Sequence, residues 1–371
     1  MAFSSNARLC VNAHSLDLTM NPVGDVGIVA LARALRDGAM PRLEELRMIN
    51  AGIDVVPTTT WLATKATDKD LRKHDGRIGA VGTRALGEAL CGMPSLTSLT
   101  FSECNLDARA IASLMEPLTR AAARTSIVEL DVANPMGDEG IYAIADAFSH
   151  GVFHRLESLR LQECDNTGLG MAALAGSLGN VSRLAELVVS GDAIEDSGWQ
   201  SLASALCKGL LPMLRCLNLG GASLGDAGLA ALSVALGSLP VLEDFVLLHC
   251  TQTGPTGLRS LAEAIAKHAS LKKLCIRGCD LGDGAIVAFC SALVPRSARA
   301  LQQLILNEEA VGDAGLWALA AALKRGAVPR LQTVYALPSN EWSPAVVRAV
   351  STARGLCRRK VRVDQSGLTP P

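Results

Sequence analysis

The sequence is poor in aromatic residues: phenylalanine, tryptophan and tyrosine together make up 3% of its 371 positions. Hydrophobic residues of all kinds nevertheless make up 49% of the chain, and charged residues only 19%. This balance excludes intrinsic disorder, because the chain has enough apolar surface to bury. Its core must be built from Leu, Ala, Val and Ile, which favours many thin, regular layers over a few large aromatic-filled cores.

The sequence also lacks an excess of either charge and any long apolar run. A net charge of −1 excludes a globally basic nucleic-acid binder and a strongly acidic mimic alike. No segment reaches the roughly 18 uninterrupted apolar residues of a membrane-spanning helix. The first residues, MAFSSNARLCVNAH, lack the apolar stretch of a secretory signal. A short mitochondrial presequence stays open as an alternative, since no acidic residue precedes Asp17.

The cysteines lack the pattern of a disulfide framework. There are 11 of them, an odd number, and no CxxC pair occurs among them. Secreted frameworks usually show an even number of clustered cysteines. We therefore expect reduced thiols and a cytoplasmic protein.

What the sequence does contain is a six-residue pattern, Leu-x-x-Leu-x-Leu, that recurs with few changes along the whole chain. It occupies residues 13–18, 43–48, 96–101, 127–132, 156–161, 184–189, 214–219, 242–247, 271–276, 301–306 and, in a worn form, 331–336. From residue 96 onward the spacing is about 28–31 residues, and a fixed period of this length indicates a repeat architecture. The sequence therefore predicts a solenoid of about eleven units.

A glycine-rich pattern accompanies each unit. Residues 217–232, LNLGGASLGDAGLAAL, taken alone would suggest a phosphate-binding turn between a strand and a helix. The same pattern, however, recurs at 24–27, 79–82, 137–140, 225–228, 282–285 and 312–315. A nucleotide needs one site rather than six, so we expect none. We instead expect the glycines to permit a tight turn and the aspartate to cap the start of the following helix.

The full unit, LxxLxLxx(N/C)xLGDxGxxxLxxAL, resembles the leucine-rich repeat, and its length resembles the ribonuclease-inhibitor subfamily. The resemblance covers roughly residues 8–340. It implies an α/β leucine-rich-repeat solenoid, or horseshoe, with a parallel concave sheet and convex helices. We expect the solenoid to span residues 1–342 with an insertion at about 50–77, and a C-terminal capping helix and basic tail to follow at 343–371.

The cysteines and histidines indicate structure rather than chemistry. The Asn/Cys position of the repeat holds Asn21, Cys104, Cys164, Cys250 and Cys279. We expect these side chains to fill buried slots beside the turns. His150 and His154 are spaced like metal ligands on a helix, but no HExxH motif surrounds them. With no nucleophile–base pair evident either, we expect no catalytic residue, no metal and no cofactor.

Partner binding is therefore expected on the inward face of the strands and at irregular segments. The predicted strand-face residues are Glu45, Arg47, Asp131, Arg160, Val188, Asn218, Val246, Leu248, Lys273, Arg277, Ile305 and Tyr335. Val246 and Leu248 form an apolar spot, which marks a partner site or the floor of an unliganded groove. The insertion offers Trp61, Lys65, Lys69, Arg72 and Lys73, either as a binding element or as a solvated segment. The basic tail is either a cap or a surface for an acidic protein, RNA or an anionic surface.

These observations favour a non-catalytic intracellular scaffold for protein partners, one form of which is a structural subunit of a cytoskeletal or ciliary assembly. Two alternatives follow from the resemblance. A GTPase regulator similar to the Ran GTPase-activating protein would carry an acidic tail, whereas the tail here, RRKVRVDQSGLTPP, is basic. A ribonuclease-inhibitor-like binder would have a strand face rich in tryptophan and acidic groups, and this face has neither in quantity.

Overall fold

The computed structural model describes residues 10–51, 78–307 and 311–336. The predicted capping helix and basic tail lie outside these ranges, as does nearly all of the insertion. Their expected roles stay predictions. The insertion residues outside the described ranges include Trp61, Lys65, Lys69, Arg72 and Lys73.

The chain divides into two compact units of alternating strands and helices. The first contains the residues up to Asn166 together with Gly176–Arg183, and the second contains Thr167–Ala175 and the residues from Leu184 onward. The elements of the first unit are β1 (Ser15–Asp17), α1 (Gly24–Arg36), β2 (Glu45–Ile49), α2 (Ala80–Leu90), β3 (Ser98–Ser102), α3 (Ala108–Arg120), β4 (Glu129–Ala133), α4 (Gly137–Ser149), β5 (Ser158–Leu161) and the 3₁₀ helix η2 (Leu178–Val181).

The second unit continues the alternation. Most of helix α5 (Gly168–Ser177) belongs to it. The elements that follow are β6 (Glu186–Ser190), α6 (Asp196–Cys207), β7 (Cys216–Gly220), α7 (Asp226–Leu236), β8 (Asp244–Leu248), α8 (Pro255–Lys267), β9 (Lys273–Arg277), α9 (Asp283–Ala292), β10 (Gln303–Asn307), α10 (Asp313–Lys324) and β11 (Thr333–Ala336).

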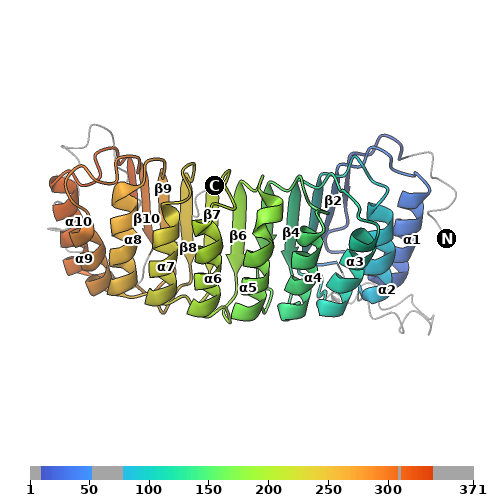
Figure 1. Ribbon diagram of the computed structural model, residues 1–371, viewed down its shortest axis with the longest axis horizontal. Coiled ribbons are helices and arrows are strands. Elements are labelled where there is room, and N and C mark those ends of the chain that lie inside the picture. The colour runs from blue at the N-terminus through green and yellow to red at the C-terminus, as the bar shows by residue number, and fades with distance from the viewer. Residues whose placement is uncertain (1–9, 52–77, 308–310, 337–371) are drawn as a thin grey trace, which may run out of the picture. The chain divides into compact units, whose positions relative to one another are not determined.

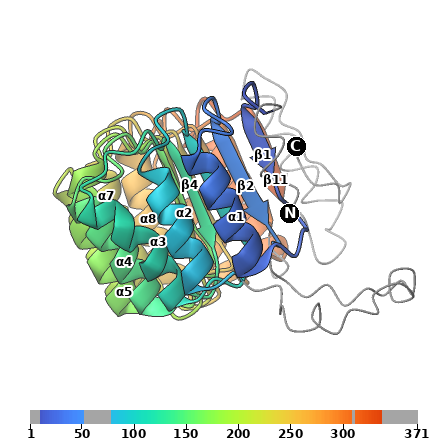
Figure 2. The ribbon, with the colours of Figure 1, turned by 90° about the vertical axis from the view of Figure 1, so that its right-hand side faces the viewer.

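Within each unit the strands form a parallel sheet, and each strand pairs with the next one in the sequence. The second leucine of the repeated pattern keeps one register, so that Leu217, Phe245 and Leu274 stack as neighbours. These side chains are fully buried beneath the helices, which cover one face of the sheet (Figures 1 and 2). Burying one such side chain contributes about 1.5–3 kcal/mol. The predicted α/β solenoid is confirmed.

The aspartates of the glycine-rich pattern do cap helices, but not their own. Asp226 makes no capping bond to α7, in which it lies. Its Oδ1 accepts hydrogen bonds from the backbone N–H groups of Gly254 (2.7 Å) and Gly257 (2.8 Å), at the start of α8. The expected assignment to the aspartate's own helix was wrong, because stacking brings the next helix start closer to the carboxylate. The same bond from the preceding repeat joins Asp25 to Gly79, Asp196 to Gly225, and Asp283 to Gly312.

The glycines are required mainly by this close approach and less by turn geometry. Gly24 and Gly137 do have positive φ, at +55° and +61°. At Gly225, however, φ is −98°, which any residue adopts. A Cβ atom on Gly257 would lie 2.7 Å from Oδ1 of Asp226, too close for an ordinary contact. The second glycine of the pattern therefore makes room for the aspartate of the preceding repeat at Gly82, Gly228, Gly257 and Gly315.

Two departures from the pattern support this explanation. Ala80 and Pro255 stand where many repeats have the aspartate, and the following repeats carry Ala110 and Ala285 in place of the second glycine. With no carboxylate to accommodate, a methyl group fits. Ala108 and Gly168 also replace the aspartate, but the repeats after them keep Gly140 and Gly198, which lie close to Met136 and Gly168 instead. Helix α3 follows α2, which begins with Ala80 and so offers no carboxylate at this position. It is capped by its own Asp107, whose side chain accepts a 2.8 Å hydrogen bond from the N–H of Ala110.

Candidate functional site

The face of each sheet turned away from the helices, here called the strand face, is the candidate site. Side chains alternate along a strand, so three positions of each five-residue strand lie on this face. In the first unit the register places Thr100 between Arg47 and Asp131. In the second unit it places Val246 between Asn218 and Cys275. Every predicted strand-face residue lies in a strand on this face; of Tyr335 only the backbone is described. Their binding role stays a prediction.

The strand face of the first unit is charged along its middle row. This row consists of Asp17, Arg47, Thr100, Asp131 and Arg160. Nη2 of Arg47 lies 2.6 Å from Oε1 of Glu45 on the same strand. The Asp131 carboxylate accepts a 3.3 Å hydrogen bond from the hydroxyl of Ser102 on the neighbouring strand. The polar groups of this face are therefore largely held by one another.

The middle row of the second unit is mostly apolar. We call Val188, Val246, Cys275 and Ile305, together with Leu248 one row further, the apolar row. Val188 is only 5% exposed, Cys275 8% and Ile305 9%, while Val246 and Leu248 are half-buried. Neighbouring strands lie about 4.8 Å apart, so these side chains cover one another. Asn218 is the polar interruption.

Cys275 is a member of this row that sequence reasoning missed. The signal was present, because Cys275 lies two residues after Lys273 and so shares its side of the strand. The thiol adds to the apolar character of the row, since an uncharged thiol packs as a small hydrophobe.

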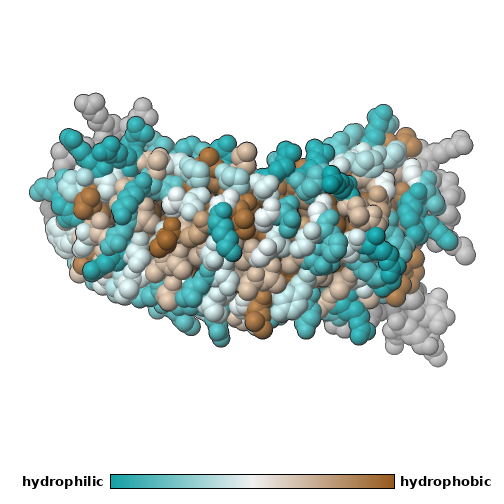
Figure 3. All heavy atoms as spheres, viewed as in Figure 1, coloured by the Kyte–Doolittle hydropathy of each residue, from teal (hydrophilic) through white to brown (hydrophobic). Residues whose placement is uncertain are grey.

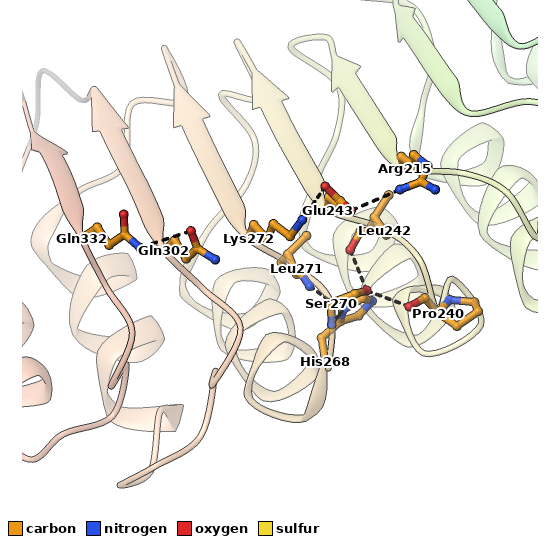
Figure 4. Close-up of polar contacts among 10 residues, drawn as sticks. All are labelled: Arg215, Pro240, Leu242, Glu243, His268, Ser270, Leu271, Lys272, Gln302 and Gln332. Atoms are coloured by element: carbon orange, nitrogen blue, oxygen red, sulfur yellow. Dashed lines mark hydrogen bonds and ion pairs between the residues drawn. The ribbon is translucent and has the colours of Figure 1, made fainter.

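Ionic groups border the apolar row where the strands begin (Figure 4). Glu243 lies between two cations, with Oε1 3.2 Å from Nη1 of Arg215 and Oε2 2.8 Å from Nζ of Lys272. The hydrogen bond from Lys272 holds the pKa of Glu243 below its usual value. Further along, the amide of Gln332 donates to the amide oxygen of Gln302 at 3.3 Å. This edge is thus occupied by an internal polar network.

His268 fixes the turn that leads into β9 (Figure 4). Its Nδ1 lies 3.1 Å from the N–H of Leu271 and its Nε2 lies 3.1 Å from the carbonyl oxygen of Leu236. These partners require a neutral ring that accepts at Nδ1 and donates at Nε2. Burial lowers the pKa of His268 and so favours this neutral form. The turn positions Lys273 on the strand face.

The buried cysteines have the structural role expected of them. The thiol of Cys104 donates to the carbonyl oxygen of Met48 at 3.1 Å, and Cys250 donates its N–H to Sγ of Cys279 at 3.3 Å. Burial raises the pKa of Cys104 to about 11 and that of Cys164 to about 12, which keeps both as thiols. Asn21 departs from the expectation: it is exposed, because no earlier turn of the described chain covers it.

Asn134 fills a buried slot that sequence reasoning did not assign. Its Oδ1 accepts from the N–H groups of Cys104 (2.8 Å) and Leu106 (3.2 Å), and its amide donates to the carbonyl oxygen of Phe101 (2.7 Å). Asn134 lies two residues after Val132, the last core residue of its strand, whereas Cys104 lies three residues after Phe101. The regular spacing of the repeat therefore did not predict Asn134 at this position. These bonds hold the end of β3 against the next repeat.

The described ranges contain neither a metal-binding group nor a membrane-spanning helix. No group of three or more His, Cys, Asp or Glu side chains among these residues is arranged to hold a metal ion. None of the described helices has the length and apolarity needed to cross a bilayer. Nδ1 of His150 lies 3.4 Å from Oδ1 of Asp146. His150 and His154 belong to no such group of three or more side chains within the described ranges.

The helix face offers less than the strand face. Figure 3 shows its apolar residues as separate spots among polar ones. Exposed large hydrophobic residues of these helices include Val234 on α7, 74% exposed, and Trp317 on α10, 48% exposed. Single exposed apolar residues are normal on a soluble surface and indicate no site. In the apolar row of the second unit, by contrast, apolar side chains follow one another from strand to strand with one polar interruption at Asn218.

The chain is similar to several known proteins. A family model described as Leucine Rich repeat matches residues 14–32 and 211–233. The chain is 28% identical to the ribonuclease inhibitor of Sus scrofa over 331 residues, which cover 86% of this chain and 70% of that protein. It is 27% identical to the NACHT, LRR and PYD domains-containing protein 12 of Mus musculus over 331 residues, but covers only 30% of that protein. A chain in the crystal structure of the Rad7 and Elc1 complex in yeast is 17% identical, with a TM-score of 0.44 over 89% of this chain and 81% of that chain.

Proposed function

Because this chain is a leucine-rich-repeat protein with repeats of the ribonuclease-inhibitor type, we propose that it is a non-catalytic scaffold that binds a protein partner on its strand face. The apolar row of the second unit is the observation that carries the proposal. Its side chains lie on the side of the sheet that none of the described helices covers.

The surroundings of the apolar row suit a protein interface. Lys273 and Arg277 flank it on β9, and Asp244 lies beside Lys273 in the register. Burial raises the pKa of Asp244, and the Lys273 ammonium opposes that rise. An apolar centre with a charged rim is the usual anatomy of a specific protein–protein interface. Central apolar anchors contribute most of the affinity there, and rim charges set orientation and association rate.

The test compares two charge insertions on opposite faces. Val246→Glu places a carboxylate in the apolar row, and Val234→Glu places the same group on the exposed face of α7. We expect tagged wild-type protein and the Val234→Glu control to recover the same partner from native cells, cross-linked through Lys272 or Lys273. The Val246→Glu variant should recover at least tenfold less, because a buried unpaired charge costs several kcal/mol at an interface.

A folding control keeps this comparison interpretable. Lys273→Glu and Arg277→Glu reverse rim charges without changing the packing of the row, and urea unfolding of each variant reports its stability. Equal recovery by wild-type, Val246→Glu and rim variants, all folded, would refute the strand face as the partner site. Turnover of a substrate by the pure protein would refute the non-catalytic part.

The finer form of the proposal is a stable subunit of a larger cytoplasmic assembly, cytoskeletal or ciliary in kind. It is supported by the length of the repeat array, which offers many weak contacts to a large partner. Gel filtration of native extract tests it, since a subunit would elute with its partner well ahead of the free 38.7 kDa chain. Elution at the free position would refute the subunit form and leave a transient binder.

A second candidate, a ribonuclease-inhibitor-like binder, is favoured by the similarity to the porcine protein. The composition of the described strand face weighs against it. Trp199 is buried in α6 and Trp317 lies on α10, so neither presents an indole on the strand face. We expect no inhibition of a pancreatic-type ribonuclease, and stoichiometric inhibition would reverse the order of the two candidates.

A further inference from the structure

Four cationic or ionisable side chains of the first unit gather at the edge where its strands begin. We call Arg124, His154, Arg155 and Arg183 the basic edge. They come from three successive connections: the one between α3 and β4, the one between α4 and β5, and the one after η2.

Hydrogen bonds hold these connections together. The N–H and the hydroxyl of Thr125, next to Arg124, both donate to the carbonyl oxygen of Val152, at 3.0 and 2.9 Å. Glu157 donates its N–H to the carbonyl oxygen of Val128 at 2.8 Å, and its Oε1 lies 3.0 Å from Nη2 of Arg183. The backbone positions of the basic edge are therefore fixed relative to one another.

The basic edge has fewer carboxylates than cations. Arg183 pairs with Glu157, but Arg124 and Arg155 are exposed and have no ion pair among the described residues. Other arginines of this unit are either paired, as Arg36 is with Glu88 and Arg84 with Glu116, or unpaired on separate helices, as Arg33 and Arg109 are among the described residues; what distinguishes the basic edge is that its cations surround one imidazole. Nδ1 of His154 is buried and lacks a hydrogen-bond partner within the described ranges. Burial, and then the three guanidinium groups, lower the pKa of His154.

We propose that the basic edge is a second docking surface, which binds an acidic segment of a protein partner through Arg124 and Arg155. A guanidinium group binds a carboxylate with two parallel hydrogen bonds, and its planar fork loses less side-chain entropy per hydrogen bond formed than a lysine does. Nucleic acid suits this surface less well. The adjacent strand β4 carries Glu129 and Asp131, with Arg160 beside Asp131 on β5; the two carboxylates disfavour an extended phosphate backbone that would cross this face, whereas a short peptide can stay at the edge.

The test uses fluorescein-labelled hexaglutamate and the full chain, with binding followed by fluorescence anisotropy at low salt. We expect the wild-type protein to bind and the affinity to fall as salt rises. The double variant Arg124→Glu/Arg155→Glu should bind at least tenfold more weakly. The control Arg33→Glu/Arg109→Glu makes the same change of net charge on α1 and α3 of the same unit, and should bind within twofold of wild type.

A second measurement locates the peptide on the protein. In NMR spectra, hexaglutamate should shift the imidazole signals of His154 and raise the pKa of that ring, and should leave His268 unchanged. The proposal is wrong if the wild-type protein does not bind hexaglutamate, or if both double variants lose affinity equally. It is also wrong if a uridine oligonucleotide binds the basic edge and hexaglutamate does not, because the partner would then be nucleic acid. Each result is independent of Val246 and so of the function proposed above.

Discussion

The two units present different surfaces on the same backbone frame. In both, the core leucines keep one register and the strands pair in the same way. The middle row of the first unit nevertheless contains Asp17, Arg47 and Asp131, whereas the corresponding row of the second contains Val188, Val246 and Ile305. The frame constrains every second residue of a strand and leaves the residues between them free. Function can therefore vary from unit to unit while the fold does not.

The sharpest way to break this comparison is to truncate adjacent residues of β8 that point in opposite directions. Leu247 is fully buried beneath the helices, and Val246 lies on the strand face. We expect Leu247→Ala to lower the free energy of unfolding by about 3 kcal/mol, through lost burial and a new cavity. Val246→Ala should cost about 1 kcal/mol or less and should weaken partner binding instead. Urea unfolding of the two variants checks the difference, and equal losses would contradict the division between frame and face.

A second prediction tests the link between repeats. Gly257→Ala should lower the free energy of unfolding by about 1–3 kcal/mol, because the added methyl group meets Oδ1 of Asp226. Asp226→Ala removes a helix cap and should cost about 1 kcal/mol. The double variant should be more stable than the sum predicts, since it recreates the natural combinations of Ala80 with Ala110 and Pro255 with Ala285. Strict additivity in this double-mutant cycle would contradict the steric explanation of the glycines.

The contact between Asp226 and Gly257 also illustrates which features can be predicted from the sequence and which cannot. The repeat spacing correctly predicted the strands, the helices and the side of the sheet on which Val246 and Lys273 lie, because these depend on periods within one unit. It misplaced the aspartate cap and missed Asn134, because those depend on what stacking brings from the neighbouring unit. Cys275, by contrast, was predictable within one unit, because it lies two residues after Lys273 and so on the same side of β9.

The charged face of the first unit allows a smaller test. Arg47 and Glu45 form an ion pair with both side chains substantially exposed. Exposed pairs contribute about 0–1 kcal/mol, because water competes for both charges. We expect Arg47→Met to change the free energy of unfolding by about 0.5 kcal/mol or less in either direction. A loss above 2 kcal/mol would mean that this row belongs to the structural frame, and the contrast with the second unit would fail.

The smallest expected effect concerns the pKa of one histidine in each unit, His154 in the first and His268 in the second. Both His154 and His268 have lowered pKa values, with burial as the largest cause, but only His154 is also subject to nearby guanidinium groups. A lowered folded-state pKa means that the unfolded chain binds the proton more readily, so each ring should reduce stability as pH falls from about 6.5 through its folded-state value. Added salt screens exposed charges but not burial. NMR titration at low and high salt should therefore show the pKa of His154 rising towards 6.5 with salt while that of His268 stays in place. If both moved together, the arginines would not be the source of the difference, and the electrostatic distinction between the two units would be lost at this position.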